Sequence, residues 1–190
     1  MKIIKTDEMG QHYLNVAVSG PSGAGKTRLC ATTGDLGNTV ILSAEGGLLS
    51  LRDVPATAIE VRSKEEIYEA YRWLSESDEA RGLQWVCVDS LSEIAEVVLA
   101  KEKEITKDVR RAYGEMADTM TKLIRSFRDL PGKHVYMSCK AERIQVDTGA
   151  MLWGPSMPGN KLAQQIPFFF DEVFFLRVHH DAETGEVKRW

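Results

Sequence analysis

The chain of 190 residues contains 43% hydrophobic and 27% charged residues, which are ordinary values for a globular protein. Its formal net charge of −4 excludes a surface coated in positive charge for nucleic acid, although local basic loops are compatible with it. No apolar run is long enough for a signal peptide or for a helix that spans a bilayer. We therefore expect one domain over residues 1–190, with no membrane partner.

The cysteines favour a reducing compartment. Cys30, Cys87 and Cys139 are odd in number and widely spaced, which suits reduced core thiols better than a disulfide framework or a metal site. Together with the lack of a targeting segment at the start of the sequence, this pattern predicts a cytoplasmic protein.

The first expected elements flank a glycine-rich segment. Residues 13–18 are typical of a short buried strand, and residues 28–33 contain no helix breaker before Gly34, which favours the end of a helix. Between them, Gly20-Pro21-Ser22-Gly23-Ala24-Gly25-Lys26-Thr27 fits the phosphate-loop pattern G-x-x-x-x-G-K-[ST] at every fixed position. Strand, glycine loop and helix in this order are the context that the motif requires.

This segment predicts a triphosphate site. Glycines let the backbone turn so that consecutive N–H groups point at phosphate oxygens, and the helix that follows adds its positive dipole end. Lys26 is expected to reach the β- and γ-phosphates, and Thr27 is expected to offer its hydroxyl to Mg²⁺. The expected ATP-binding residues are Gly20, Pro21, Ser22, Gly23, Ala24, Gly25, Lys26, Thr27 and Arg28.

Two further apolar runs end in acids. Residues 39–45 form a β-branched run that presents Glu45 at its carboxyl end, where ligands gather in open α/β sheets. Residues 85–89 form a second buried run, and an aspartate such as Asp89 holds Mg²⁺ in P-loop ATPases, usually through water. The alternative for Asp89 is a turn-forming residue that merely ends a strand. Between the runs we expect a short strand over 57–61 and a helix that begins at the Ser63-Lys64-Glu65-Glu66 capping box and stops near Asp78.

The second half of the chain continues this alternation. We expect helices over 91–105 and 113–127 and from about 161 to 166, and strands over 134–139 and 173–178. The connection between the first two helices is basic, and Lys140 closes the first of the two strands. From Lys140 to Gly159 we expect a long functional loop with a projecting hairpin, turned at Asp147-Thr148-Gly149. The chain ends at Trp190 in an apparent strand.

Alternating strands and helices predict an α/β fold with a mostly parallel sheet and helices on both faces. Asp89 is followed by Ser90 and not by the second acid that AAA-type ATPases usually carry there, whereas Glu45 ends the strand after the phosphate-loop helix. In this order of parts the chain resembles RecA-type recombinases, which implies a RecA-like P-loop NTPase core. Residues 157–162 and 166–173 are similar to small phage-encoded proteins of that group, some of which act as single-strand annealing ATPases.

The resemblance implies roles for individual residues. Glu45 would activate the attacking water beside the catalytic Lys26, Asp89 would serve Mg²⁺, and Ser138 or Lys140 would sense the γ-phosphate. The implied contacts with single-stranded DNA are Lys107, Arg110, Arg111, Lys140 and Arg143, and Lys161 would act across an interface in a homo-oligomeric ring or filament. A phage single-strand DNA-binding protein is an implied partner, in the cytoplasm of a bacterial host. The chain departs from the family pattern at Ser138-Cys139-Lys140, where RecA-type proteins tend to have a glutamine sensor.

Several alternatives stay open. The basic run around Lys107 could be a solvated helix end, and Trp153 could either stack on a base or lie buried under its loop. A P-loop kinase would pass the γ-phosphoryl group to a small acceptor, with Arg143 in a mobile lid, although Glu45 favours activation of water. A nucleotide-controlled assembly module with little turnover is a third function class.

Overall fold

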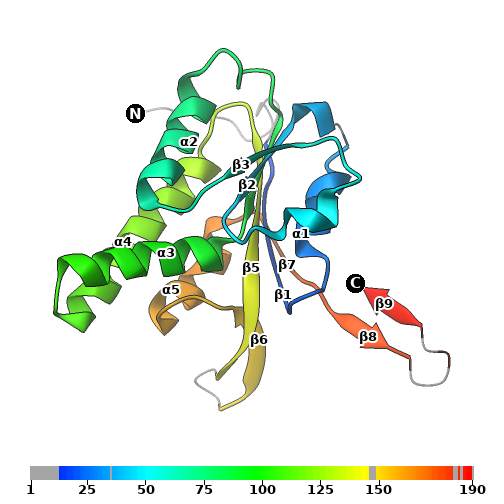
Figure 1. The fold of residues 1–190 in the computed structure, drawn as a ribbon. Coiled ribbons are helices and arrows are strands. Elements are labelled where there is room, and N and C mark those ends of the chain that lie inside the picture. Colours follow the sequence, from blue (N-terminus) through cyan, green and yellow to red (C-terminus); the bar gives the residue numbers. More distant parts are fainter. Residues whose placement is uncertain (1–12, 35, 146–148, 182–183, 185, 190) are drawn as a thin grey trace, which may run out of the picture.

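Apolar strands that are far apart in the sequence lie side by side in one seven-stranded sheet (Figure 1). The computed structural model describes residues 13–34, 36–145, 149–181, 184 and 186–189. Six strands run parallel in the order β3-β2-β4-β5-β1-β7, and the seventh, β6, pairs antiparallel with the end of β5. Their bounds are β1 Asn15–Gly20, β2 Thr39–Ser43, β3 Thr57–Glu60, β4 Trp85–Asp89, β5 His134–Gln145, β6 Met151–Pro155 and β7 Glu172–Phe175. The predicted α/β fold with a mostly parallel sheet is therefore confirmed.

The strand register brings the expected polar residues to one edge of the sheet. β5 lies between β1 and β4, and Gly20 at the end of β1 stands opposite Lys140. On the other side of β4, Asp89 stands opposite Ser43 at the end of β2. Because all these strands are parallel, their carboxyl ends meet at the edge where ligands bind in open α/β sheets.

One face of the sheet carries the larger core. It is covered by α2 (Lys64–Glu76), α3 (Leu91–Ile105), α4 (Val109–Arg128) and α5 (Asn160–Gln165), which all lie to the left of the sheet in Figure 1. Met116, Met120 and Ile124 of α4 are buried against strand residues such as Val88 and Met137. The methionines at helical spacing are therefore core residues.

The other face is covered more thinly. The phosphate-loop helix α1 (Lys26–Leu29) has four residues and passes into a 3₁₀ turn at Cys30–Thr32, and a second 3₁₀ segment covers Gly47–Leu51. The helix expected to run to residue 33 is thus shorter than predicted. Thr32 and Thr33 donate their hydroxyls to the carbonyls of Leu29 and Cys30, and such bonds compete with helical continuation.

Helix caps fix where the basic connection ends. Ser63 and Ser90 accept from the N–H groups of Glu66 and Glu93 at the starts of α2 and α3. Asp108 accepts from the N–H groups of Arg110 and Arg111, so α4 begins at Val109 and not near residue 113 as expected. Both arginines consequently belong to the first turn of a helix.

Two strand predictions are wrong in their bounds. β5 does not close at Lys140 but continues to Gln145, because from Ala141 onwards it pairs with β6 and forms the expected hairpin. The turn predicted at Asp147-Thr148-Gly149 lies mostly outside the described residues. The last core strand stops at Phe175 because its neighbour β1 ends at Gly20.

The chain then forms a separate antiparallel pair, β8 (Val178–His180) with β9 (Val187–Arg189), which extends away from the sheet (Figure 1).

Within the described part of the chain, no helix is both long and apolar enough to cross a membrane.

Cys30, Cys87 and Cys139 are buried and form no disulfide. A hydrogen bond with Cys87, followed by burial, raises the pKa of the Cys30 thiol, and burial raises the pKa of Cys139 to about 12.

These buried thiols should not react in the folded protein. Since the thiolate is the nucleophile, a raised pKa keeps Cys30 and Cys139 protonated at pH 8 to 9, and burial shields all three thiols from reagent. Titration with Ellman's reagent should therefore give no fast reaction in the native state at any pH from 7 to 9. All three thiols should react once the chain is unfolded in guanidinium. Fast native reactivity that rises through pH 8.5 would mean an exposed thiol with an ordinary pKa.

Candidate nucleotide site

The phosphate loop has the backbone that its glycines allow. Gly23 and Gly25 have φ angles of +72° and +102°, a region that other residues rarely adopt. At Gly20 the requirement is space, because an added Cβ would lie 3.0 Å from the Cβ of Leu176. The loop between β1 and α1 lines a cleft of about 510 Å³, together with Glu45, Lys140 and the 3₁₀ segment that contains Gly47.

Lys26 lies over this loop. Its Nζ donates to the carbonyls of Gly20 at 2.9 Å and Pro21 at 3.0 Å. The backbone of Lys26 is also fixed to the sheet, because the hydroxyl of Tyr136 in β5 donates to the Lys26 carbonyl at 2.8 Å. Burial raises the pKa of Tyr136, so this hydroxyl stays a donor. The ammonium group is thus held by two neutral carbonyls of the phosphate loop. The charged oxygens of a bound phosphate would be stronger hydrogen-bond acceptors and would replace them.

Thr27, which lines the cleft, forms one connected group with the buried residues Asp89 and Ser138. Asp89 Oδ2 accepts from Thr27 Oγ1 at 2.6 Å, and Asp89 Oδ1 accepts from Ser138 Oγ at 2.5 Å. Asp89 is only 1% exposed and Ser138 is fully buried. The three residues come from α1, β4 and β5, so the strand order places Ser138 between the phosphate loop and Asp89.

The oxygen atoms of this group fit Mg²⁺. A hydroxyl and a carboxylate are the hard ligands that Mg²⁺ prefers, and it usually takes its remaining ligands from phosphates and water. Ser43, the register partner of Asp89, has a buried hydroxyl without a hydrogen-bond partner, which a metal-bound water would satisfy. Among the residues that the structure describes, no group of three or more His, Cys, Asp or Glu side chains is placed to hold a metal ion.

Glu45 lies two residues beyond the end of β2, so the strand is shorter than expected. Its position is fixed by Ser90, whose Oγ donates to Glu45 Oε1 at 2.5 Å. Ser90 is fully buried and also caps α3. Sequence reasoning missed this role of Ser90, although the pattern Ser90-x-x-Glu93 before an apolar run is a capping box that marks the start of α3.

Lys140 lines the cleft but is held by α3. Its Nζ donates to Glu93 at 2.5 Å and to Glu96 at 3.2 Å, and the bond to Glu93 is the main reason that its pKa is raised. Its backbone N–H donates to Ser92 Oγ, which in turn donates to the carbonyl of Ser156 after β6. The start of α3 therefore holds both strands of the hairpin at their base.

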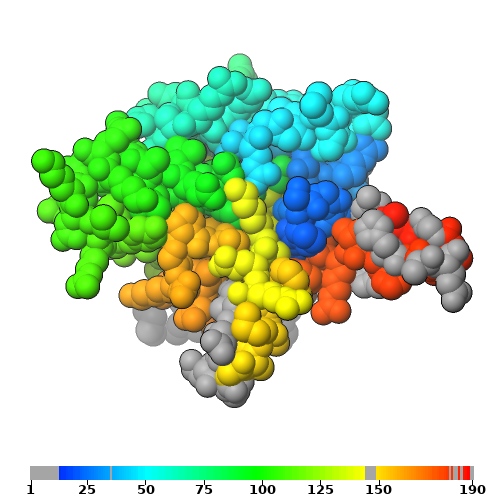
Figure 2. Space-filling view, turned by 60° about the horizontal axis from the view of Figure 1, so that its bottom comes forward, coloured from blue at the N-terminus to red at the C-terminus, as the bar shows by residue number. Residues whose placement is uncertain are grey.

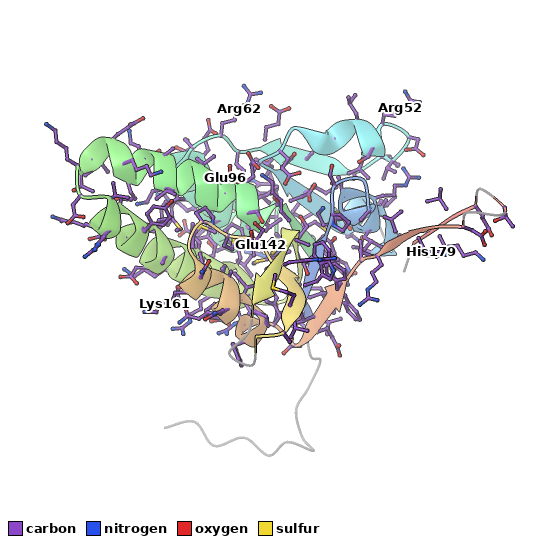
Figure 3. All side chains as sticks on the ribbon, turned by 90° about the horizontal axis from the view of Figure 1, so that it is seen from below. Arg52, Arg62, Glu96, Glu142, Lys161 and His179 are labelled. Atoms are coloured by element: carbon purple, nitrogen blue, oxygen red, sulfur yellow. The ribbon has the colours of Figure 1, made fainter. Side chains whose placement is uncertain are left out.

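Two other predicted residues lie in different surroundings. Arg28 lines the cleft, yet its guanidinium pairs with both oxygens of Asp53, at 2.5 and 3.0 Å. Lys161 is exposed on α5, as Figure 3 shows, and lines a larger hollow of about 730 Å³ between α4 and α5, away from the phosphate loop.

The expected DNA-contacting residues fall into two groups, one beyond the far end of α3 and one beside the cleft. Lys107, Arg110 and Arg111 follow α3, whose 15 residues rise roughly 22 Å along its axis. In Figure 3, α3 runs from the central site to one end of the molecule, whereas the hairpin that carries Arg143 projects beside the site. Arg111 also has a partner on its own helix, with Glu115 3.8 Å away.

Comparison with known proteins agrees with this geometry. Residues 12–189 match a family model described as an AAA domain. No curated protein matches the chain. The presence of Ser90 after Asp89 therefore does not set the chain apart from AAA-type proteins, contrary to the expectation from sequence. The chain belongs to this AAA-domain family of P-loop ATPases, whose members bind nucleotide.

Proposed function

We propose that this protein hydrolyses ATP with Mg²⁺, using Glu45 to activate water. The observation that carries the proposal is the connected group of Thr27, which lines the phosphate-loop cleft, with the buried Asp89 and Ser138. Thr27 and Asp89 are the residues that would hold Mg²⁺. When bound, the ion neutralises charge on the β- and γ-phosphate oxygens.

The residues of the chain supply binding, orientation and a base. Lys26 exchanges its two carbonyl partners for phosphate oxygens. Ser138 senses the γ-phosphate indirectly, because its hydroxyl donates to the carboxylate of Asp89. Ser90 holds one carboxylate oxygen of Glu45, which leaves the other oxygen to accept a proton from the attacking water. Lys140 is the second candidate γ-phosphate sensor, since a phosphate in the cleft competes for it with Glu93 and Glu96.

We further propose a RecA-like, phage-type role in DNA recombination or replication, in which the protein binds single-stranded DNA and assembles with itself in the host cytoplasm. The hairpin of β5 and β6 supports DNA binding, because it projects from the ligand-binding edge and carries Arg143 and the half-exposed Trp153 (Figure 2). Lys161 and Phe168 support assembly, since both line the hollow beside α5 and Phe168 is 86% exposed. We propose a single-strand DNA-binding protein as a further partner of this protein in that role.

Replacing Glu45 tests the base. Glu45→Gln should bind ATP normally but hydrolyse it at least about 10²-fold more slowly, because the amide cannot take the proton. Lys26→Ala is the matched control, in which calorimetry should show loss of ATP binding while circular dichroism stays unchanged. If Glu45→Gln turns over normally and Glu93→Gln does not, the base has been placed on the wrong element.

Ser90 offers a second test, with an internal control. Ser90→Ala and Ser63→Ala remove the same kind of helix cap, so each should cost about 1 kcal/mol of stability. Only Ser90 also orients Glu45, so only Ser90→Ala should lower kcat, by roughly tenfold, with little change in KM. Ser90→Thr should restore the rate. Equal kcat values for Ser90→Ala and Ser63→Ala would remove Ser90 from the mechanism.

The rate of ATP hydrolysis, measured with and without single-stranded DNA and with small hydroxyl acceptors, separates the functions. We expect DNA to stimulate hydrolysis. A phosphorylated acceptor would instead establish a kinase, and ATP binding without turnover would leave an assembly module.

Removing Arg110 and Arg111 together should weaken DNA binding for all sequences alike and reduce the slope of log affinity against log salt by roughly 0.7 per lost contact. An unchanged slope would leave that segment as a solvated helix end.

A further inference from the structure

Four side chains form a layered cluster between the hairpin and the end of β7. The rings of Trp153 and Phe175 are stacked, with centroids 5.6 Å apart and an angle of 29° between their planes. The guanidinium of Arg143 lies 5.3 Å from the Trp153 ring centroid, and that of Arg177 lies 5.9 Å from the Phe175 ring centroid. Two cations thus flank two aromatic rings, all from segments at the ligand-binding edge of the sheet.

The cluster is open to solvent and borders the nucleotide cleft. Trp153 is 47% exposed, and both arginines are exposed. A hollow of about 320 Å³ lies against the two rings, and its lining is Pro21, Trp153, Phe175, Leu176, Arg177 and Val178. Pro21 belongs to the phosphate loop and also lines the cleft above it. The two hollows therefore adjoin.

The chemistry of this lining favours an aromatic, anionic ligand. The lining includes two aromatic residues and one arginine but no acidic residue, in a chain whose net charge is −4. An unpaired nucleobase can stack on such rings whatever its identity, because every base has a π face. Arginine beside the rings can hold the phosphate that accompanies the base.

We infer that Trp153 and Phe175, flanked by Arg143 and Arg177, form a stacking platform for an unpaired nucleobase. The inference rests on the proposed function, because the base belongs either to a single DNA strand or to the ATP held in the adjoining cleft. Phe175 packs against Trp153, and a base would take the place of the Arg143 guanidinium over the Trp153 ring, while the two arginines bind phosphate.

The test compares Trp153→Ala, Trp153→Phe and Leu152→Ala. Leu152 is a matched control, since it is the neighbouring residue on β6, is 55% exposed, and lies on the opposite face of the hairpin by strand alternation. Fluorescence anisotropy gives the affinity for a labelled oligothymidine and for an abasic strand of equal length, which keeps the phosphates but lacks the bases. Calorimetry gives the affinity for ATP and for inorganic tripolyphosphate.

If the platform binds a DNA base, Trp153→Ala should weaken oligothymidine binding roughly tenfold or more and leave abasic-strand binding unchanged. Trp153→Phe should retain most of the affinity, and Leu152→Ala should match the parent protein. If the platform binds the base of ATP, Trp153→Ala should weaken binding of ATP but not of tripolyphosphate. Arg143→Ala with Arg177→Ala should weaken binding of abasic and normal strands equally.

The outcomes also separate this inference from the proposed function. A parent protein that binds no oligonucleotide contradicts the DNA-binding role, while the comparison of ATP with tripolyphosphate still tests the platform. If Trp153→Ala behaves like Leu152→Ala toward both oligothymidine and ATP, the platform is wrong, and Trp153 then only covers the apolar end of β7.

Discussion

The carboxylate of Asp89 lies at the end of β4 with only 1% of the residue exposed, where an unpaired charge would cost several kcal/mol. Thr27 and Ser138 make this burial tolerable, because each donates a hydroxyl to a different oxygen of the carboxylate. Since Thr27 follows the phosphate loop and Ser138 lies on β5, the two bonds tie the ends of three neighbouring elements together. The bond to Asp89 thereby fixes the position of Thr27, the residue that follows Lys26 and lines the cleft.

The start of α3 joins this group to the surface of the molecule. Ser90 holds Glu45, Glu93 and Glu96 hold Lys140, and Ser92 connects the two strands of the hairpin at their base. The groups that would meet the γ-phosphate and the hairpin proposed to meet DNA are thus attached to the first two turns of one helix. A phosphate that draws Lys140 away from α3 changes the contacts at the root of the hairpin, which gives a physical route between the two sites.

Local patterns predicted most of the fold, because each core strand is a run of apolar residues and each major helix has its cap. Trp85–Asp89 was placed correctly to the residue for this reason. The strand order is a long-range property, so sequence alone could not show that β5 lies between the phosphate loop and Asp89. The length of β5 was underestimated because its last residues are held by pairing with β6, which no local pattern reveals.

The residues of the site also divide into those that local motifs predict and those that depend on long-range contacts. The placement of Lys26, Thr27 and Asp89 at one edge of the sheet was predictable from motifs, since their positions in the chain are fixed by the loop and by the strand ends. Ser90 was overlooked because its partner, Glu45, is 45 residues away in sequence. The separation of Arg110 and Arg111 from the hairpin depends on the direction of α3, which is set by its packing against α4 and the sheet.

Asp89 and Thr27 are proposed to form the magnesium site for a bound triphosphate. Calorimetry of ATP binding with Mg²⁺ and with EDTA, in the parent protein and in Asp89→Asn, tests it most directly. We expect Mg²⁺ to tighten ATP binding in the parent protein and to have little effect in Asp89→Asn, with the affinity in EDTA unchanged or higher because a negative charge has been removed. An equal gain from Mg²⁺ in both proteins would contradict the claim.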